Sequence, residues 1–426
     1  MAVITTQECY SDDWRRTDPD FAVFLPTEPS YHPEAADHFL VDYTPRGDLL
    51  AILTVCSRLD GADFSVVHMR SNDGGVSWST PAVIDGPGRK PGQVAAYGFP
   101  VISRSGRIYC FYHKSTGIGD SLQHSHLRCK YSDDDGYTWN DGGVDFPFRR
   151  SKYDHPDPTV LPQCIVWQKP IRDSKGRLMV GVSHWTSSYL RPRLMPNVGG
   201  KEIRSEFFRF DNIDEGPDPK DLKLTWLQND DTMVEVPAEY EPAASDGRVF
   251  AFEPAPTLLP DGRLFLSIRT GNGNIWYSVS EDDGETWRQT EVLRYRDGGE
   301  PILNPDSPAP IYGLEDGRYI LFMQNHDGYG HGGQGPFELN ARRPQFLAVG
   351  EFQPGAHQPI WFSEPLLFAD TQNVGVFPLY FKWLSMYASL TERDGQRTFW
   401  YTDRKIFALG RHITDEMLAG LTIPSP

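Results

Sequence analysis

The stretch Ser280-Glu-Asp-Asp-Gly-Glu-Thr-Trp287 has two further versions in the chain, Ser71-Asn-Asp-Gly-Gly-Val-Ser-Trp78 and Ser132-Asp-Asp-Asp-Gly-Tyr-Thr-Trp139. Each octet follows a short strand-like run, so each is predicted to form the tip of a β-hairpin. Aspartate can accept hydrogen bonds from the backbone two residues on, and glycine supplies the positive φ that many tight turns need. We therefore expect the octets to stabilise turns and to take no part in chemistry.

A second repeat consists of an apolar strand, a polar turn with one glycine, and another apolar strand. It occurs six times, with its turn glycines at Gly47, Gly106, Gly176, Gly262, Gly317 and Gly395. This spacing leaves room for one four-stranded sheet per repeat, and repeated four-stranded sheets close into a β-propeller. The sequence thus predicts an all-β fold, a six-bladed β-propeller of four-stranded antiparallel blades. The octets would join the outer strands of blades one, two and four.

The domain organisation follows from the same repeat. We expect a single propeller domain over residues 1–426, because closed all-β architectures remain single domains at large sizes. The longest gap between turn glycines, from Gly176 to Gly262, predicts an insertion at about 187–235 between blades three and four. One short helix is expected within residues 414–421.

Composition limits the partners. The formal net charge of −17 argues against nucleic acid, which needs a basic face. Any anionic ligand must therefore be bound by a local group of arginines or lysines. No apolar run approaches the length of a membrane span, and the first residues lack a secretory leader. These features predict a cytoplasmic protein, or a secreted one if a leader has been removed. Five cysteines without a C-x-x-C pair indicate buried thiols or a reducing compartment.

Counting from the turn glycines predicts which side chains meet at the propeller axis. The ninth residue before each glycine is, in blade order, His38, Tyr97, Trp167, Glu253, Pro308 and Met386. The seventh residue after it is Thr54, His113, Ser183, Arg269, Gln324 and Thr402. Both strand ends should meet at one mouth of the channel, and neighbouring offsets add Tyr387 and His184. Ionisable and aromatic side chains at this mouth predict a pocket, the alternative being a narrow hydrated channel.

Over roughly residues 35–405 the chain resembles the sialidase superfamily, the Asp-box or BNR-repeat propellers. Residues 252–287 resemble the segment that carries the family's catalytic glutamate and one arginine of its triad. Residues 386–391 resemble the segment with the nucleophilic tyrosine, and Ala341-Arg-Arg-Pro344 the segment with the last triad arginine. The resemblance implies that Tyr387 is the nucleophile, that Glu253 is the base activating it, and that Arg269 and Arg343 bind a carboxylate. A neutral tyrosine needs such a base, and it repels an anionic substrate less than a carboxylate nucleophile would.

Two family residues are missing. His38-Phe39-Leu40 stands where the family has its first triad arginine, and Ala95–Pro100 contains no counterpart of the acid/base aspartate. An ordinary sialidase is therefore not expected. His38, His113 and Tyr97 could supply the missing proton transfer, in a hydrolase with His113 or Tyr97 as the acid. They equally suit a lyase that eliminates across a uronic acid, as some sialidase-like propellers do with rhamnose-glucuronate.

The predicted ligand is an acidic oligosaccharide or glycoconjugate, of the uronic- or sialic-acid type. We assign its binding to Arg269, Arg343, Trp167, His184 and Gln324. A non-catalytic glycan-binding propeller is the third alternative. No cofactor and no metal are expected. The acidic, proline-rich stretch 154–158 can ligate a metal, but such loops more often only turn. The sequence leaves the oligomeric state open.

Overall fold

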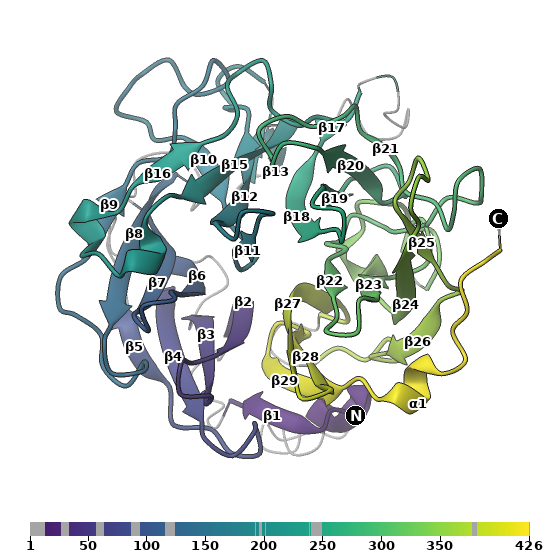
Figure 1. The fold of residues 1–426 in the computed structure, drawn as a ribbon, viewed down its shortest axis with the longest axis horizontal. Coiled ribbons are helices and arrows are strands. Elements are labelled where there is room, and N and C mark those ends of the chain that lie inside the picture. The colour runs from purple at the N-terminus through teal and green to yellow at the C-terminus, as the bar shows by residue number, and fades with distance from the viewer. Residues whose placement is uncertain are drawn as a thin grey trace, which may run out of the picture.

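The computed structural model describes residues 13–26, 34–56, 64–86, 94–115, 124–191, 193–195, 198–200, 202–237, 239, 249–331, 333–376 and 381–425. Six antiparallel sheets follow one another around a central axis (Figure 1). This arrangement confirms the predicted six-bladed, all-β propeller. The only α-helix of the described residues, α1 (Asp415–Leu418), falls within the expected segment, and its N-cap Thr414 accepts a hydrogen bond from the amide of Met417. No helix of this part of the chain has the length and apolar character to cross a membrane.

The blades take their strands in chain order. Blade one contains β2 (Glu34–Tyr43), β3 (Leu49–Cys56), β4 (Ser65–Ser71) and β5 (Ala82–Asp85). Blade two contains β6 (Ala95–Ile102), β7 (Ile108–Ser115), β8 (Ser125–Ser132) and β9 (Val144–Phe146). Blade four contains β18 (Phe252–Leu258), β19 (Leu264–Arg269), β20 (Trp276–Ser280) and β21 (Glu291–Val292). Blade five contains β22 (Ile311–Gly313), β23 (Tyr319–Met323), β24 (Gln345–Phe352) and β25 (Ile360–Phe362), and β26 (Leu366–Ala369) also pairs with β24.

Blade three corrects the predicted insertion at 187–235. Its main strands are β10 (Gln163–Ile165), β12 (Leu178–Trp185), β15 (Glu202–Phe210) and β16 (Leu224–Trp226), and β11 (Ile171–Arg172) and β17 (Val249–Phe250) pair at its margins. The predicted insertion thus contains the third and fourth strands of blade three itself. The extra length lies within the blade, where β13 (Arg193–Met195) and β14 (Val198–Gly200) form a separate small hairpin. The sequence count misses this because β15 follows no recognisable turn repeat.

Blade six is completed by the beginning of the chain. Its strands are β27 (Leu384–Arg393), β28 (Gln396–Asp403), β29 (Phe407–His412) and β1 (Phe21–Phe24), in that order from the axis outward (Figure 1). β1 pairs antiparallel with β29, with Phe21 opposite Gly410. Aromatic contacts pack this junction, since Phe21 stacks on Trp400 with 5.6 Å between ring centroids and meets His412 edge-on at 4.8 Å.

The two sequence repeats form the turns predicted for them. All six repeat glycines have φ between 76° and 97°, the left-handed region that glycine tolerates. In the octet at 280–287, the Ser280 hydroxyl accepts from the Gly284 amide at 2.8 Å, and Asp282 accepts from the amide and hydroxyl of Thr286 at 2.8 and 2.6 Å. Each octet tryptophan packs against the preceding blade, as Trp287 does on Phe207 at 4.9 Å. The octets therefore fasten turns and join neighbouring blades.

The hydrophobic core lies between the blades. One cluster combines Leu40 of blade one with Phe111 of blade two and Val182 of blade three, all of them fully buried. The four cysteines within the described residues, Cys56, Cys110, Cys129 and Cys164, carry free thiols.

Candidate active site at one mouth of the channel

Bulges at the ends of the inner strands position the predicted site residues. The pairing of β6 with β7 is interrupted between Ala96 and Phe99, and that of β18 with β19 between Phe252 and Ala255. Tyr97 and Glu253 lie in these bulges with φ of 55° and 48°, which is unfavourable for side chains with a Cβ. A bulge re-aims a side chain that would otherwise lie against the neighbouring sheet. The bulges explain why the ninth residue before the glycine points towards the axis.

The seventh-position residues fasten these bulges to the preceding blade. The Thr54 hydroxyl accepts a hydrogen bond from the Tyr97 amide at 2.8 Å, and the Ser183 hydroxyl accepts from the Glu253 amide at 2.8 Å. In the same way, Nε2 of His113 accepts from the Val166 amide at 3.0 Å. Each bond joins one blade to the next at equivalent positions. Thr54, His113 and Ser183 therefore serve the assembly of the channel wall.

Arg269 holds the centre of the site. Its Nη1 donates to Glu253 Oε2 at 2.7 Å and lies 3.4 Å from the Tyr387 hydroxyl, while its Nε donates to Asp306 Oδ1 at 2.6 Å. No hydrogen bond joins Tyr387 directly to Glu253 among the described residues. Arg269 stands between the two groups, and the second carboxylate oxygen of Glu253, Oε1, is buried without a hydrogen-bond partner.

Burial controls the proton affinities of this group. Burial raises the pKa of Glu253, and the charge of Arg269 offsets part of the rise. Burial also raises the pKa of Tyr387, and the nearby Glu253 carboxylate adds to that effect, whereas Arg269 and Arg342 act against it. A carboxylate that binds protons more tightly than usual is better suited to receive a phenolic proton.

The structure brings Arg342 beside Glu253 and Tyr387, whereas the predicted Arg343 contacts Asp370. Arg343 forms a two-pronged ion pair with Asp370, with Nε–Oδ1 and Nη2–Oδ2 distances of 2.9 and 2.8 Å. Arg342 donates from Nε to the carbonyl oxygen of Asp306 at 3.0 Å. Its positive charge acts to lower the pKa of both Glu253 and Tyr387. Consecutive residues here point in different directions, so the arginine pair in the sequence does not reveal which member faces the site.

Arg342 is a buried cation without a matching anion. Its side chain is 4% exposed, and no carboxylate forms an ion pair with it anywhere in the described part of the chain. Burial lowers the pKa of its guanidinium, and the positive charge of Arg269 lowers it further. A buried charge is costly unless it is paired. The position therefore favours an anionic ligand beside Arg342.

His38 and His113 lie close to the site, but their ring nitrogens are engaged within the protein. His113 contacts Ser125 Oγ through Nδ1 at 2.9 Å, besides its bond from the Val166 amide. His38 faces the carbonyl oxygens of Gly98 and Trp167 at 3.2 and 2.6 Å. Burial lowers the pKa of His38 to about 4 and that of His113 to about 3. Neither histidine is placed to exchange protons with a ligand, so the geometry does not support His113 as the acid, and Tyr97 remains the other residue predicted for that role.

The aromatic residues complete the wall of the site. Tyr97 lies between His38 and His113, with ring-centroid distances of 6.1 and 5.7 Å. Trp167 is fully buried beneath Tyr387 at 6.3 Å and donates to the carbonyl of Pro254 at 3.3 Å. Trp167 thus supports the nucleophile candidate from behind, and its ring has no surface exposed to a ligand.

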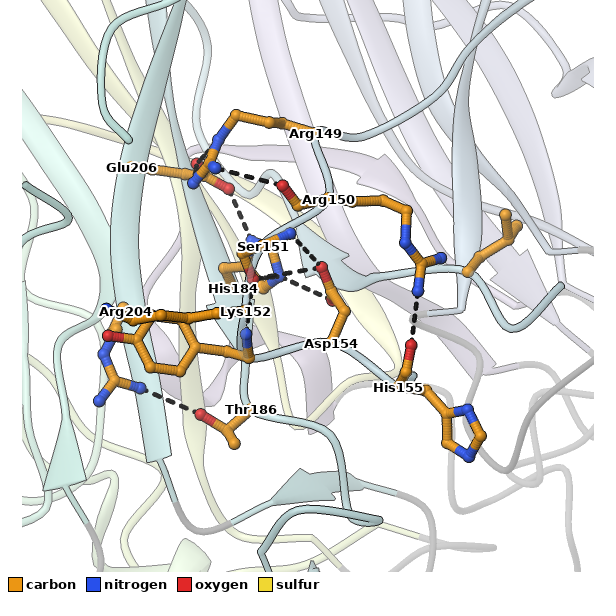
Figure 2. Close-up of polar contacts among 12 residues, drawn as sticks. Arg149, Arg150, Ser151, Lys152, Asp154, His155, His184, Thr186, Arg204 and Glu206 are labelled. Atoms are coloured by element: carbon orange, nitrogen blue, oxygen red, sulfur yellow. Dashed lines mark hydrogen bonds and ion pairs between the residues drawn. The ribbon is translucent and has the colours of Figure 1, made fainter. Parts of the chain in front are cut away.

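Two predicted ligand-binding residues lie elsewhere. Gln324 is fully buried and donates from Nε2 to Gln345 at 2.9 Å. His184 lies on β12 between two carboxylates, Glu206 and Asp154, rather than beside Tyr387 (Figure 2). Both residues sit one strand away from the bulges that turn side chains towards the axis. The offsets from the turn glycines do not account for this.

The counting rule also misses several residues around Tyr387. Asp306 accepts from Arg269, and Lys405 lies with its Nζ 5.4 Å from the centre of the Tyr387 ring. Trp383 lies beside Arg342 and Lys405, at 5.0 and 5.1 Å. Asp306 and Arg342 come from long connections of blade five, outside the paired strands on which the count is based. Lys405 follows Arg404 in the turn between β28 and β29, where both residues have positive φ.

Comparison with known proteins agrees with this architecture. The model of the BNR repeat-like domain matches residues 47–395 of the chain. The chain belongs to the BNR repeat-like domain family. A search of curated proteins with this chain found no match.

Solved structures extend the likeness of this BNR repeat-like protein. It resembles a sialidase from Streptococcus pneumoniae at 12% identity and a TM-score of 0.60, over 95% of this chain and 71% of that one. It resembles the leech intramolecular trans-sialidase at 14% identity and a TM-score of 0.59, over 93% and 70%. An α-L-arabinanase from Penicillium chrysogenum matches at 14% identity and a TM-score of 0.50, over 93% and 98%. At these identities the likeness shows the fold shared with glycoside hydrolases.

Proposed function

We propose that the protein is a sialidase-like glycosidase that cleaves the terminal glycosidic bond of an acidic oligosaccharide at this mouth of the channel. Arg342 is the observation that carries the proposal. Its guanidinium is buried beside Tyr387 and Glu253 and is not paired with a carboxylate of the described residues. A sugar carboxylate bound there would supply the missing negative charge through charge-assisted hydrogen bonds.

Substrate charge is the first consequence. The structural neighbours include proteins named sialidases and an arabinanase, so the fold is compatible with more than one class of sugar. The positive charge of Arg269 lowers the pKa of Arg342, and Arg269 already pairs with Glu253 and Asp306. The unpaired cation in this pair therefore selects an acidic ligand over a neutral one.

Tyr387 and Glu253 supply the chemistry in this proposal. The Tyr387 hydroxyl would attack the anomeric carbon as its proton passes to Glu253, and water would then hydrolyse the glycosyl-tyrosine intermediate. The ligand carboxylate would draw Arg269 towards itself. This movement opens the way between the Tyr387 hydroxyl and Glu253, whose Oε1 has no hydrogen-bond partner. In the first step the glycosidic bond would break and its departing oxygen would take a proton from water; in the second step Tyr387 would leave the sugar and recover its proton from Glu253.

The two other functions receive less support from the geometry. A lyase mechanism requires a histidine or tyrosine free to move protons, and the ring nitrogens of His113 contact Ser125 and Val166 within the wall. A glycan-binding propeller would use Arg342 equally well. It would, however, have no need for a tyrosine and a carboxylate gathered around one buried arginine.

One experiment separates the three functions. The protein is incubated with matched acidic and neutral oligosaccharides, and new reducing ends and the ultraviolet absorbance of unsaturated uronic acid are followed together. The proposal expects reducing ends from acidic substrates only, retained anomeric configuration and no unsaturation. Unsaturated product would instead establish the lyase, and tight binding without turnover would establish the binding module.

Two variants test the roles of the residues. Tyr387→Phe should lower turnover by at least about 10²-fold, the scale expected for removal of a nucleophile or general acid–base. Tyr137→Phe is the matched control, because Tyr137 is 57% exposed on an octet turn. If Tyr387→Phe retains turnover within about twofold of Tyr137→Phe, Tyr387 is not the nucleophile.

A further inference from the structure

A second group of chemically reactive side chains lies on the sheet of blade three. Cys164 on β10 is directly opposite His184 on β12, and Glu206 on β15 is opposite Val182, two residues before His184 on the same strand. One potential ligand atom from each of the three lies within 4.8 Å of the other two. All three side chains are buried, at 2% exposure or less. Three adjacent strands of one sheet thus bring a thiol, an imidazole and a carboxylate together in the interior.

Both ring nitrogens of His184 face carboxylates. Its Nδ1 lies 2.6 Å from Glu206 Oε1, and its Nε2 lies 2.9 Å from Asp154 Oδ1 (Figure 2). Histidines that bind metals commonly donate the remaining ring N–H to a carboxylate, which fixes the ring and its tautomer. Asp154 is itself held, because its Oδ2 accepts from the Ser151 amide at 2.6 Å.

Glu206 is oriented in a similar way. Its Oε2 accepts from Nε and Nη2 of Arg149 at 3.0 and 2.9 Å, which leaves Oε1 directed at His184 (Figure 2). Arg149 is further fixed by an ion pair with Asp230 at 2.6 Å. Arg149 thus pairs with Oε2 of the Glu206 carboxylate, and Oε1 faces Cys164 and His184.

We propose that Cys164, His184 and Glu206 bind a divalent transition-metal ion, zinc in the first instance, with Asp154 and Arg149 holding two of the ligands in place. Thiolate sulfur, imidazole nitrogen and a carboxylate oxygen together are the donor set that zinc prefers. Three protein ligands leave one position of a tetrahedral ion for a water molecule. The three donor atoms already lie within 4.8 Å of one another, so shifts of the side chains would bring them onto one ion.

The charge balance allows a buried divalent cation to replace two protons at this site. Without a metal, the proton of the Cys164 thiol and the proton shared by His184 and Glu206 fill the site. Binding one divalent cation releases both protons, so the net charge of the site does not change. The ion pairs of Arg149 with Glu206 and Asp230 are retained. The desolvation that usually opposes a buried charge is therefore not increased.

The metal content tests the proposal independently of enzymatic activity. The purified protein is treated with a chelator, dialysed, and titrated with Zn²⁺ and separately with Co²⁺. We expect one equivalent of Zn²⁺ and a Co²⁺ spectrum with a thiolate charge-transfer band and tetrahedral d–d bands. Both should be lost in Cys164→Ser and kept in Cys56→Ser, a matched control at the half-buried thiol of Cys56.

Two further variants distinguish this site from the exposed acidic loop beside it. His155→Ala should bind normally, because His155 lies in that loop and outside the cluster. Asp154→Asn should keep the stoichiometry but weaken Zn²⁺ binding by about 10- to 100-fold, the usual effect of losing a residue that orients a metal-bound histidine. The proposal is overturned if the wild-type protein takes up well under one equivalent, if Cys164→Ser keeps the thiolate band, or if His155→Ala abolishes uptake. The wild-type Co²⁺ spectrum decides the matter even if a variant fails to fold.

Discussion

Arg342 and Arg343 are consecutive in the chain, yet their guanidinium groups serve different parts of the molecule. Arg343 is bound through two hydrogen bonds by Asp370, whereas Arg342 lies beside Tyr387 and Glu253 with no carboxylate of the described residues paired to it. One arginine is therefore satisfied within the protein, and the other is available for a ligand.

Replacing Arg342 should weaken ligand binding, whereas replacing Arg343 should lower the stability of the protein. Arg342→Gln should weaken binding of glucuronate or sialic acid by roughly 10- to 100-fold, the contribution of a hydrogen bond to a charged group. It should leave the free energy of unfolding nearly unchanged, because it removes a charge that is unpaired in the free protein. Arg343→Gln should leave ligand affinity unchanged but lower the unfolding free energy by about 1–3 kcal/mol, discounted for the partial exposure of Asp370. NMR titration and urea unfolding measure the two quantities, and the reverse pattern would restore Arg343 to the site.

The bonds between blades at the bulges predict a loss of stability. Ser183→Ala leaves the amide of Glu253 buried without an acceptor, so the unfolding free energy should fall by about 1–3 kcal/mol. Thr54→Val should do the same for the amide of Tyr97. Ser79→Ala provides a control, because the Ser79 hydroxyl also accepts a hydrogen bond from a backbone amide but lies on an exposed residue in an octet hairpin. Equal unfolding midpoints in urea for Ser183→Ala and the wild type would contradict the assigned role.

The stability of the protein should decrease in mild acid because of two histidines. Folding holds the pKa of His38 near 4 and that of His113 near 3, whereas the unfolded chain should titrate near its ordinary value of about 6.5. As the pH falls below about 6.5, the unfolded state therefore binds protons that the folded state does not, and stability is lost. By pH of about 4.5 each histidine should cost about 2–3 kcal/mol relative to neutral pH.

A substitution isolates that effect. His113→Gln should be less stable than the wild type at neutral pH, because it disturbs the bonds to Ser125 and Val166. Its stability should nevertheless fall less steeply on acidification, as judged by urea unfolding at several pH values. His155→Gln, on an exposed loop, should keep the wild-type slope. A slope that is the same in His113→Gln and the wild type would show that His113 is not the source of the acid sensitivity.

The octet turns should contribute to the stability of the fold and have no role in catalysis. Ser280→Ala removes the hydroxyl that accepts from the Gly284 amide and donates to Asp282, and it should lower the unfolding free energy by about 1–2 kcal/mol. Turnover at saturating substrate should stay within about twofold of the wild type once both are fully folded. A large drop in turnover with unchanged stability would place the octet in the chemistry after all.

Some features of the fold and the site could be predicted from the sequence, and others could not. The turn glycines are visible because each needs a positive φ, so counting them gives the number of blades. Glu253, Arg269 and Tyr387 are found because they sit on or beside regular strands. Arg342 and Asp306 lie in irregular connections, where no periodicity predicts the direction of a side chain. His184 lies on a regular strand and Gln324 directly follows one, but their partners Glu206 and Gln345 lie on neighbouring strands of the same blades, which no periodicity predicts. β1 has only four residues and no turn repeat, so its place in blade six depends on a strand far away in the chain.

The pairing of β1 with β29 has a consequence for the order in which the chain can fold. Phe21 lies opposite Gly410, so this ladder joins residues 389 positions apart, and a ribosome must make the chain beyond Gly410 before the ring can close. Contacts so distant in sequence form slowly, and an unfilled strand edge can recruit another chain while it waits. A circular permutant that carries β1 directly after His412 would make all four strands of that sheet consecutive. Such a permutant should reach the closed ring faster and aggregate less during refolding.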